Sequence, residues 1–170
     1  MPLTATEQQR LGLIRPELRS ALVALMGAAA ATYSFTTAVP LDGGTRTAEK
    51  QTALYLDSLA QGGGTELAYP VGEPGSSRHE YGAAFDLHII RGGTGDDGAG
   101  SDRDYAQLAE LAESFGLTAG YYWSHSDPFH FQLSEPLQVS IEAWAAMRRD
   151  RLVTIAAVAI GAGLIVAAVS

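Results

Sequence analysis

The stretch SRHEYGAAFD, residues 77–86, places the imidazole of His79 seven residues before the carboxylate of Asp86. Gly82 and two alanines lie between them, and such small residues let the backbone fold closely around an ion. The stretch leads into residues 83–90, which alternate and are apolar enough for a buried strand. We therefore expect a metal-binding or catalytic site where a loop passes into this strand.

A second polar pair follows in WSHSDPFHF, residues 123–131, which contains Asp127 and His130. The chain has no cysteine, so any metal site must use histidine and carboxylate ligands. Two neutral imidazoles and one carboxylate around a zinc ion leave a fourth position for water, as in hydrolytic zinc sites. Asp127, three residues before His130, is placed to accept a proton from that water.

Together the two motifs resemble the signature of a family of zinc peptidases. The pattern S-x-H-x-x-G-x-A-x-D, followed by D/E-x-x-H and an aromatic residue, is similar to that of the D-alanyl-D-alanine carboxypeptidases and L-alanyl-D-glutamate endopeptidases, which share the hedgehog-type fold. The resemblance covers residues 14–133 and includes the segment GTRT, residues 44–47, with Gln51 and Tyr55 after it. It implies that the chain hydrolyses the peptide part of bacterial peptidoglycan.

The resemblance also implies roles for individual residues. One zinc ion per chain is expected to be held by His79, Asp86 and His130, with Asp127 as the general base. Arg46 is expected to contact the substrate and the developing oxyanion, because a fixed cation there stabilises charge that exists only in the transition state. Further expected substrate-binding residues are Gln51, Ser77 and His125.

The form D-x-x-H-F, preceded by G-L-x-x-G-x-x-W, resembles the endopeptidase branch that is common among phage lysins. The first alternative is a D-alanyl-D-alanine carboxypeptidase. An alternative of another class is a non-catalytic module, in which zinc only stabilises a wall-binding or phage-particle fold. The presence of Asp127 and Arg46 counts against that alternative, because a structural zinc site needs neither.

Two other groups of polar residues carry side chains that can bind metal ions. His88 follows Asp86 by two residues on the predicted strand, and we interpret it as a core or supporting imidazole instead of a metal ligand. The acidic loop 96–104 lacks the spacing and the terminal glutamate of a calcium-binding EF-hand, so a solvated loop is the preferred interpretation, with calcium binding left open.

The remaining pattern predicts an α+β fold, with a small mixed or antiparallel sheet flanked by helices. Helices are expected at residues 16–31, 47–60, 104–115 and 140–149, and strands at 33–39, 83–90, 117–123 and 129–133. Three parts are expected in the chain: a peptidase domain at residues 1–140, a basic connecting helix at 141–151, and a hydrophobic helix at 152–170.

Residues 152–169 carry no charge, and as a helix they would extend about 27 Å, close to the thickness of a bilayer core. We expect this helix to cross a membrane or to be buried against phage-particle proteins. The N-terminal stretch does not have the pattern of a secretory signal peptide, which favours phage delivery to the cell wall. A formal net charge of −8 makes nucleic acid an unsuitable partner.

Overall fold

The computed structural model describes residues 2–60, 71–91 and 100–151. By its internal contacts the chain divides into two compact units, Met1–Glu135 and Pro136–Ser170. All of the strands and the candidate site lie in the first unit. In the second unit, residues 137–151 are helical, in agreement with the helix predicted at 140–149.

The first unit begins with two helices, α1 (Ala5–Leu11) and α2 (Pro16–Thr32). The sequence analysis did not predict α1, although Thr4 and Glu7 form a capping box at its start. Gly12 ends it with a φ of 62°, a backbone conformation that glycine adopts without strain. The predicted helix at 16–31 is confirmed, and its buried side chains recur every three or four residues: Leu18, Leu22, Leu25, Met26 and Ala29.

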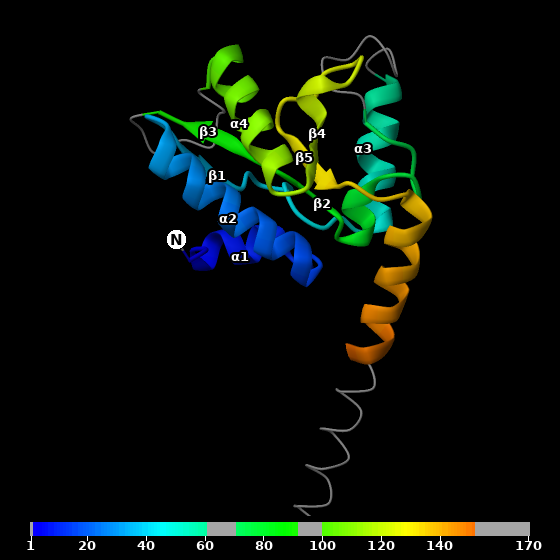
Figure 1. Cartoon of the computed structure of the whole chain (residues 1–170). Coiled ribbons are helices and arrows are strands. Elements are labelled where there is room, and N and C mark those ends of the chain that lie inside the picture. The colour runs from blue at the N-terminus through cyan, green and yellow to red at the C-terminus, as the bar shows by residue number, and fades with distance from the viewer. Residues whose placement is uncertain (1, 61–70, 92–99, 152–170) are drawn as a thin grey trace, which may run out of the picture. The chain divides into compact units, whose positions relative to one another are not determined.

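The strands form two small antiparallel sheets (Figure 1). One pairs β1 (Thr36–Ala38) with β3 (His88–Ile90), and the other has the order β2-β5-β4, where β2 is Ala84–Asp86, β4 is Leu117–Ala119 and β5 is His130–Leu133. Together with the helices, they confirm the predicted α+β class.

Three predicted strands differ from those observed. The strand expected at residues 83–90 is interrupted at Leu87, whose backbone N–H donates to the Phe129 carbonyl outside the regular ladder. This break lets β2 and β3 pair in different sheets. The strand expected at 117–123 ends at Ala119, because the chain then turns into the 3-10 helix η3 (Gly120–Tyr122). The strand expected at 33–39 is limited to β1.

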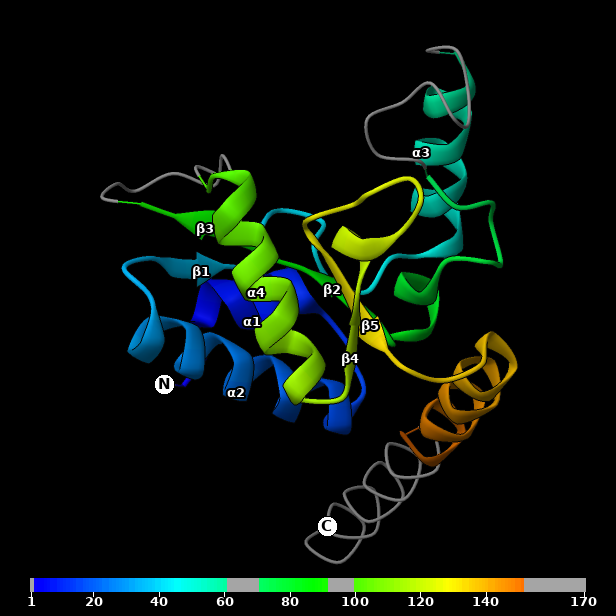
Figure 2. The ribbon, with the colours of Figure 1, turned by 45° about the horizontal axis from the view of Figure 1, so that its top comes forward.

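The other two helices of this unit are α3 (Ala48–Ala60) and α4 (Asp102–Ser114). The hydroxyl of Thr47 accepts a hydrogen bond from the Lys50 N–H at 3.2 Å, which confirms the predicted start of α3. Ser101 caps α4 and forms a capping box with Asp104. In Figure 2, α4 lies over α2 and beside β4, and it contacts both.

One hydrophobic core joins α1, α2, α4 and the strands. Phe85 of β2 and Phe131 of β5 are fully buried at its centre and stack with their ring centroids 5.7 Å apart. Because alternate residues of a strand face opposite sides, burying Phe85 and Phe131 turns Asp86, His130 and Gln132 away from this core. The core therefore determines the direction in which the candidate ligands point.

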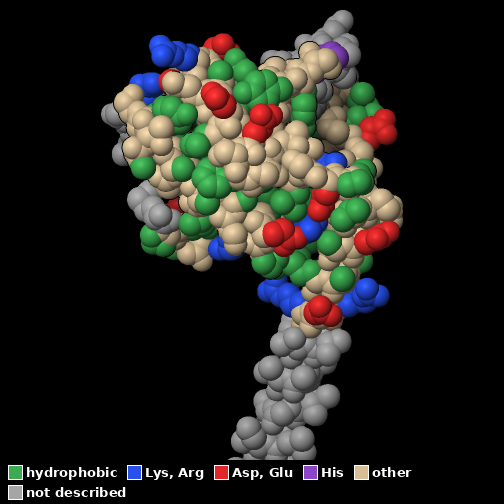
Figure 3. Space-filling view, viewed as in Figure 1, with side chains coloured by type: hydrophobic (Ala, Val, Ile, Leu, Met, Phe, Trp, Pro, Cys, Tyr) green, Lys and Arg blue, Asp and Glu red, His purple; other side chains and the backbone are tan. Residues whose placement is uncertain are grey.

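The surface of the molecule carries charges of both signs. On the face seen in Figure 3, acidic and basic side chains are interspersed among hydrophobic and neutral atoms. Among the described residues, no helix is both long enough and apolar enough to cross a membrane. The hydrophobic helix predicted at residues 152–170 lies outside the described residues, as do Asp96 and Asp97 of the acidic loop.

Candidate metal centre

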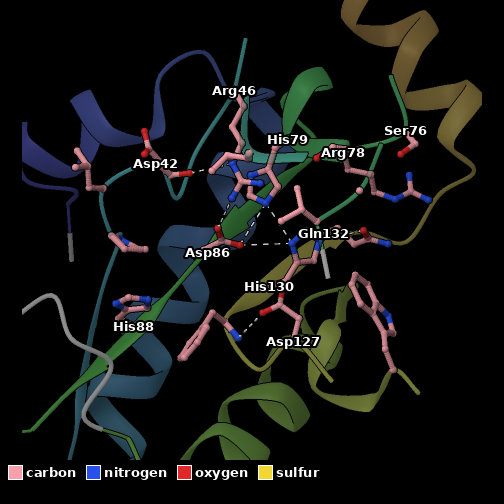
Figure 4. Close-up of a pocket in the computed structure, with 18 residues that line it drawn as sticks. Asp42, Arg46, Ser76, Arg78, His79, Asp86, His88, Asp127, His130 and Gln132 are labelled. Atoms are coloured by element: carbon pink, nitrogen blue, oxygen red, sulfur yellow. Dashed lines mark hydrogen bonds and ion pairs between the residues drawn. The ribbon is translucent and has the colours of Figure 1, made fainter. Parts of the chain in front are cut away.

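Three elements bring His79, Asp86 and His130 together. His79 belongs to the 3-10 helix η2 (Arg78–Tyr81), Asp86 is the last residue of β2, and His130 is the first residue of β5. Asp86 and His130 are direct partners in the antiparallel register, so the strand pairing itself places one ligand opposite another. Figure 4 shows the three side chains pointing toward one another.

The ligand atoms are His79 Nε2, Asp86 Oδ1 and His130 Nδ1. The two nitrogens are 3.2 Å apart, and Asp86 Oδ1 lies 3.2 Å from His79 Nε2 and 3.4 Å from His130 Nδ1. Zinc bonds of about 2.0–2.1 Å in tetrahedral geometry place neighbouring ligand atoms about 3.3–3.4 Å apart. The described triangle therefore has the dimensions of one face of a zinc tetrahedron.

Each ligand has an outer hydrogen-bond partner. His79 Nδ1 lies 2.8 Å from the carbonyl oxygen of Gly44, and because a carbonyl only accepts, the proton must be on Nδ1. His130 Nε2 lies 3.1 Å from Gln132 Oε1, and Arg46 Nη2 donates to Asp86 Oδ2 at 2.9 Å. With the outer nitrogens protonated, three lone pairs converge inside the cluster, and a cation would satisfy all three.

Electrostatics favour the charge states that bind a metal ion. Burial lowers the pKa of His79, although Asp86 opposes this effect, so the imidazole tends to be neutral. Burial alone would raise the pKa of Asp86, but His79 and His130 outweigh it and hold this pKa well below its usual value. The site thus presents a neutral imidazole and an ionised carboxylate, which are the forms that bind metal.

Gly44 allows the loop before α3 to pack closely against the end of α1. A Cβ atom at this position would lie 2.3 Å from both the Cα and the carbonyl oxygen of Leu11, a contact that no side chain tolerates. The loop is also fixed by two backbone bonds, from Thr45 N–H to the Leu11 carbonyl and from Arg46 N–H to the His79 carbonyl. The segment GTRT therefore supports His79 through its backbone as well as supplying Arg46.

Asp127 lies beside the cluster, below His130 in Figure 4. Its backbone N–H donates to the Gly120 carbonyl at 2.9 Å, and its Oδ1 accepts from the Phe129 N–H at 3.3 Å. Burial raises the pKa of Asp127, and the nearby charge of Asp86 adds to this effect. A Cβ atom on Gly120 would be 2.6 Å from the Asp127 carbonyl, so the loop closes only over a glycine.

The cluster opens into a cavity of about 580 Å³. Six of the residues that line it are Arg46, Ser77, Arg78, Trp123, Asp127 and Gln132. Trp123 is 39% exposed, and its ring centroid lies 5.0 Å from that of His130, so it covers one side of this ligand. The structure thus places Arg46, Ser77 and Asp127 at the cavity, where the sequence analysis expected them.

Gln51 and His125 are placed differently from Ser77. Gln51 is fully buried on α3, and its Nε2 donates at 2.6 Å to the carbonyl of Gly72, which lines the cavity. His125 lies exposed in the loop after η3 and does not line the cavity. In this structure Gln51 supports the cavity wall, and His125 is away from the ligands.

His88 lines the cavity but is not among the clustered ligand atoms. Its ring packs against Phe129 with centroids 4.8 Å apart, and Figure 4 shows it to one side of the cluster. This position agrees with the interpretation of His88 as a supporting imidazole. Sequence reasoning missed two partners of the ligands, the Gly44 carbonyl and the Gln132 side chain. For Gln132 a signal was present, because it follows His130 by two residues on a strand.

Comparison with known proteins places this geometry in context. Residues 71–133 match the sequence model of a peptidase family described as D-alanyl-D-alanine carboxypeptidase. A search of curated protein sequences found no match. The family match covers both motifs of the site and confirms the predicted resemblance. With the three-ligand cluster, it also confirms the prediction of a metallopeptidase domain with a zinc-type site.

Solved structures are similar over most of the chain. The L,D-carboxypeptidase DacB from Streptococcus pneumoniae is 23% identical with a TM-score of 0.53, and the match covers 82% of this chain and 75% of that one. The L-Ala D-Glu endopeptidase ChiX from Serratia marcescens is 22% identical with a TM-score of 0.53, covering 78% and 89%. A mutant of the vancomycin-resistance D,D-pentapeptidase VanY in complex with Zn(II) is 21% identical with a TM-score of 0.53, covering 78% of each chain. These similarities establish a shared fold.

Proposed function

We propose that the chain is a zinc-dependent peptidase that hydrolyses peptide bonds in the stem or cross-link peptides of bacterial peptidoglycan. The observation that carries this proposal is the triangle of His79 Nε2, Asp86 Oδ1 and His130 Nδ1, whose sides of 3.2, 3.2 and 3.4 Å fit tetrahedral zinc. The family match supports the peptidase activity, and solved structures with the same fold are an L,D-carboxypeptidase, an L-Ala D-Glu endopeptidase and an LD-carboxypeptidase whose structure is described for peptidoglycan recognition.

One zinc ion held by His79, Asp86 and His130 would lower the pKa of its water to about 7 and polarise the scissile carbonyl. The chain's own residues fix the orientation of the ligands and the side from which a peptide can approach. Gly44, Arg46 and Gln132 orient the ligands from outside, and the cavity leaves one side of the cluster accessible to a peptide.

Asp127 is proposed as the general base. Its carboxylate lines the cavity beside the ligands, and the Gly120 carbonyl and Phe129 N–H fix its loop. It would accept the proton of the attacking water and deliver it to the leaving amine. Burial raises its pKa, which brings its basicity closer to the range useful for proton transfer.

Arg46 is proposed to contact the substrate and the developing oxyanion. Its Nη2 pairs with Asp86 and its Nε donates to the Asp42 carbonyl at 3.3 Å, so the guanidinium is fixed at the cavity before substrate binds. A preorganised cation of this kind stabilises charge that develops in the transition state. Ser77 is proposed as a further substrate contact, because it lines the same cavity. His125 and Gln51 are also proposed as substrate contacts, with less support, since neither lines the cavity.

Within this class we propose cleavage of the L-alanyl-D-glutamate bond. The motif form Asp127-x-x-His130-Phe131 supports this choice, and ChiX is a solved endopeptidase with the same fold. A D-alanyl-D-alanine carboxypeptidase is the second candidate, favoured by the description of the matching family. The two activities differ in their products, because only the endopeptidase separates L-alanine from the rest of the stem.

The experiment is digestion of purified peptidoglycan with zinc-loaded protein, followed by mass spectrometry of the soluble fragments. The proposal expects stem peptides that begin at D-glutamate, and none after chelation of the metal. Release of free D-alanine alone would establish the carboxypeptidase candidate instead. Zinc-loaded, folded protein that releases no fragment from several chemotypes of peptidoglycan would favour a non-catalytic wall-binding or phage-particle module.

The chain beyond residue 151 is proposed to serve as an anchor, either in a membrane or against phage-particle proteins. Its support is the run of eighteen uncharged residues at 152–169, whose exposure to water would be unfavourable. Delivery by a phage would bring such a protein to the cell wall. A chain truncated after Arg149 should stay soluble and active on dissolved peptidoglycan fragments, and loss of activity would mean that the removed segment belongs to the peptidase domain.

A further inference from the structure

Gln132 and His130 lie on the same face of β5. Between them, Phe131 points into the core and is fully buried, so its two neighbours point together toward the cavity. The register pairs Gln132 with Ala84 on one side and Thr118 on the other. Both partners are short, which leaves room for the glutamine side chain to turn back along the strand.

A metal ion bound by His130 determines which of these two side chains donates the hydrogen bond between them. His130 Nδ1 faces His79 and Asp86 inside the cluster, so it must keep its lone pair for a metal ion. A neutral imidazole then carries its proton on Nε2, which lies 3.1 Å from Gln132 Oε1. The amide oxygen of Gln132 therefore accepts this proton's hydrogen bond.

The two histidines are held by different means. The proton of His79 is fixed by the backbone carbonyl of Gly44, which no side-chain substitution removes. The proton of His130 is fixed by a side chain that is only half-buried and can be substituted. If Gln132 is lost, His130 can place its proton on Nδ1 and lose its capacity to bind a metal ion in that tautomer.

We propose that Gln132 is a positioning residue that holds His130 in the Nε2–H tautomer and so sets the zinc affinity of the site. The inference rests on the proposed zinc function. Outer-shell partners of histidine ligands fix the orientation and tautomer of the ring, and their loss weakens metal binding by about 10- to 100-fold. Among the described residues, the side chain that hydrogen-bonds His130 Nε2 is that of Gln132.

Gln132 also lines the cavity, so a direct contact with substrate is the competing role. The two roles change different quantities. A substrate contact affects KM at saturating zinc and leaves the zinc affinity unchanged. A positioning role affects the zinc affinity and leaves KM unchanged once the site is fully loaded.

The experiment measures zinc affinity at pH 7 by competition with a chromophoric chelator, using the full chain. Gln132→Met keeps the length of the side chain but removes the acceptor, and it should weaken zinc binding by about 10- to 100-fold. Gln132→Glu keeps an acceptor and should bind zinc at least as tightly as the parent. Gln107→Met on α4, outside the cavity, is the matched control and should bind like the parent.

The outcomes separate this inference from the proposed function. Equal zinc affinity in Gln132→Met and the parent would overturn the inference alone, and so would a loss in Gln132→Glu as large as that in Gln132→Met. A parent chain that binds no zinc would overturn the proposed function and the inference with it. Circular dichroism of the metal-free variants should match the parent, which shows that any change in affinity does not come from misfolding.

Discussion

Two nearly buried carboxylates in the first unit, those of Asp104 and Asp86, have different surroundings. Arg91 donates to both oxygens of Asp104, at 2.5 and 2.9 Å, and the Ser101 N–H adds a third bond at 2.8 Å. Asp86 receives Arg46 on Oδ2 only, whereas its Oδ1 faces two imidazole nitrogens. Both oxygens of Asp104 thus accept from nitrogen donors, whereas the inner oxygen of Asp86 faces two imidazole nitrogens that a cation would bridge to it.

This difference separates a structural cluster from a functional one. A buried polar group with all partners present adds to stability, while converging acceptors are costly unless something binds between them. The site at Asp86 therefore exchanges some stability of the metal-free fold for the ability to hold an ion. The predictions below test this contrast.

The largest effect is expected from removing a ligand. His79→Ala, Asp86→Ala and His130→Ala should each lose most of the bound zinc and nearly all hydrolysis, because three protein ligands are needed to hold the ion. Zinc should raise the melting temperature of the parent but not of these variants, since metal binding is coupled to folding. Elemental analysis and thermal unfolding check both effects. Three variants with full zinc content would contradict the ligand assignment.

Asp127→Ala should retain zinc and lose turnover by about 10²- to 10⁴-fold, the usual contribution of general acid–base catalysis. The backbone bonds of Asp127, from its N–H to the Gly120 carbonyl and from the His130 N–H to its own carbonyl, do not involve the carboxylate, so the ligand loop should persist. Zinc content and the rate of peptidoglycan digestion are measured on the same sample. Near-normal turnover would transfer the base role to another residue, with His125 as the first to test.

Gly120→Ala tests whether the position of Asp127 matters. The added methyl group would lie 2.6 Å from the Asp127 carbonyl and 3.2 Å from His130 Cβ, so the loop must shift. A displacement of about 1 Å can cost up to about 100-fold in rate. We expect a 10- to 100-fold loss of turnover. Gly116→Ala is the control, because a Cβ atom there meets nothing within 4 Å, although its φ of 74° adds strain. If Gly120→Ala is as active as the parent, the loop position is not critical.

The smallest effect on activity is expected at Asp104, whose oxygens accept hydrogen bonds from Arg91 and Ser101. Asp104→Ala removes the partner of Arg91 and part of the α4 cap, and it should destabilise the fold by about 1 kcal/mol without changing turnover at saturating zinc. Glu110→Ala, an exposed position on the same helix, is the control. Urea unfolding and digestion rates check the two parts, and a loss of turnover greater than the loss of folded protein would link this cluster to the site.

The stability difference between the parent and Asp104→Ala is expected to depend on pH. Arg91 holds the pKa of Asp104 below its usual value, so folding favours the ionised carboxylate. The stabilisation is therefore complete above the unfolded-state pKa of about 3.9 and is lost as the pH falls below it. The difference in stability between the parent and Asp104→Ala should narrow on acidification below about pH 4. A difference that is constant down to pH 2 would contradict this explanation.

The sequence predicts the site better than it predicts the sheets. His79, Asp86, His130 and Asp127 occupy fixed positions in two motifs, and the fold brings three of them within bonding range of one ion. The strand at 83–90 was predicted as continuous because its residues alternate and are apolar enough for a buried strand. Its interruption at Leu87 depends on a bond to Phe129, more than forty residues away, which local pattern does not reveal.

The supporting residues show the same limit. The Gly44 carbonyl holds His79 while Gly44 packs on the backbone of Leu11, a contact between a loop and the end of α1. The contact of Gln51 with the Gly72 carbonyl is likewise a bond between two segments that the local pattern around Gln51 does not reveal. Gln132 was detectable from the alternation of β5, once the position of His130 is known. Roles that belong to a fixed motif or to the alternation of one strand are therefore readable from sequence, whereas supporting contacts that depend on packing between segments are not.

The most direct test of the zinc site is anomalous diffraction at the zinc absorption edge from crystals of the full chain grown with zinc. The predicted result is a single strong peak in the first unit, about 2.0–2.2 Å from His79 Nε2, Asp86 Oδ1 and His130 Nδ1. A zinc peak bound elsewhere, or no peak between these atoms in crystals of protein that digests peptidoglycan, would contradict the assignment.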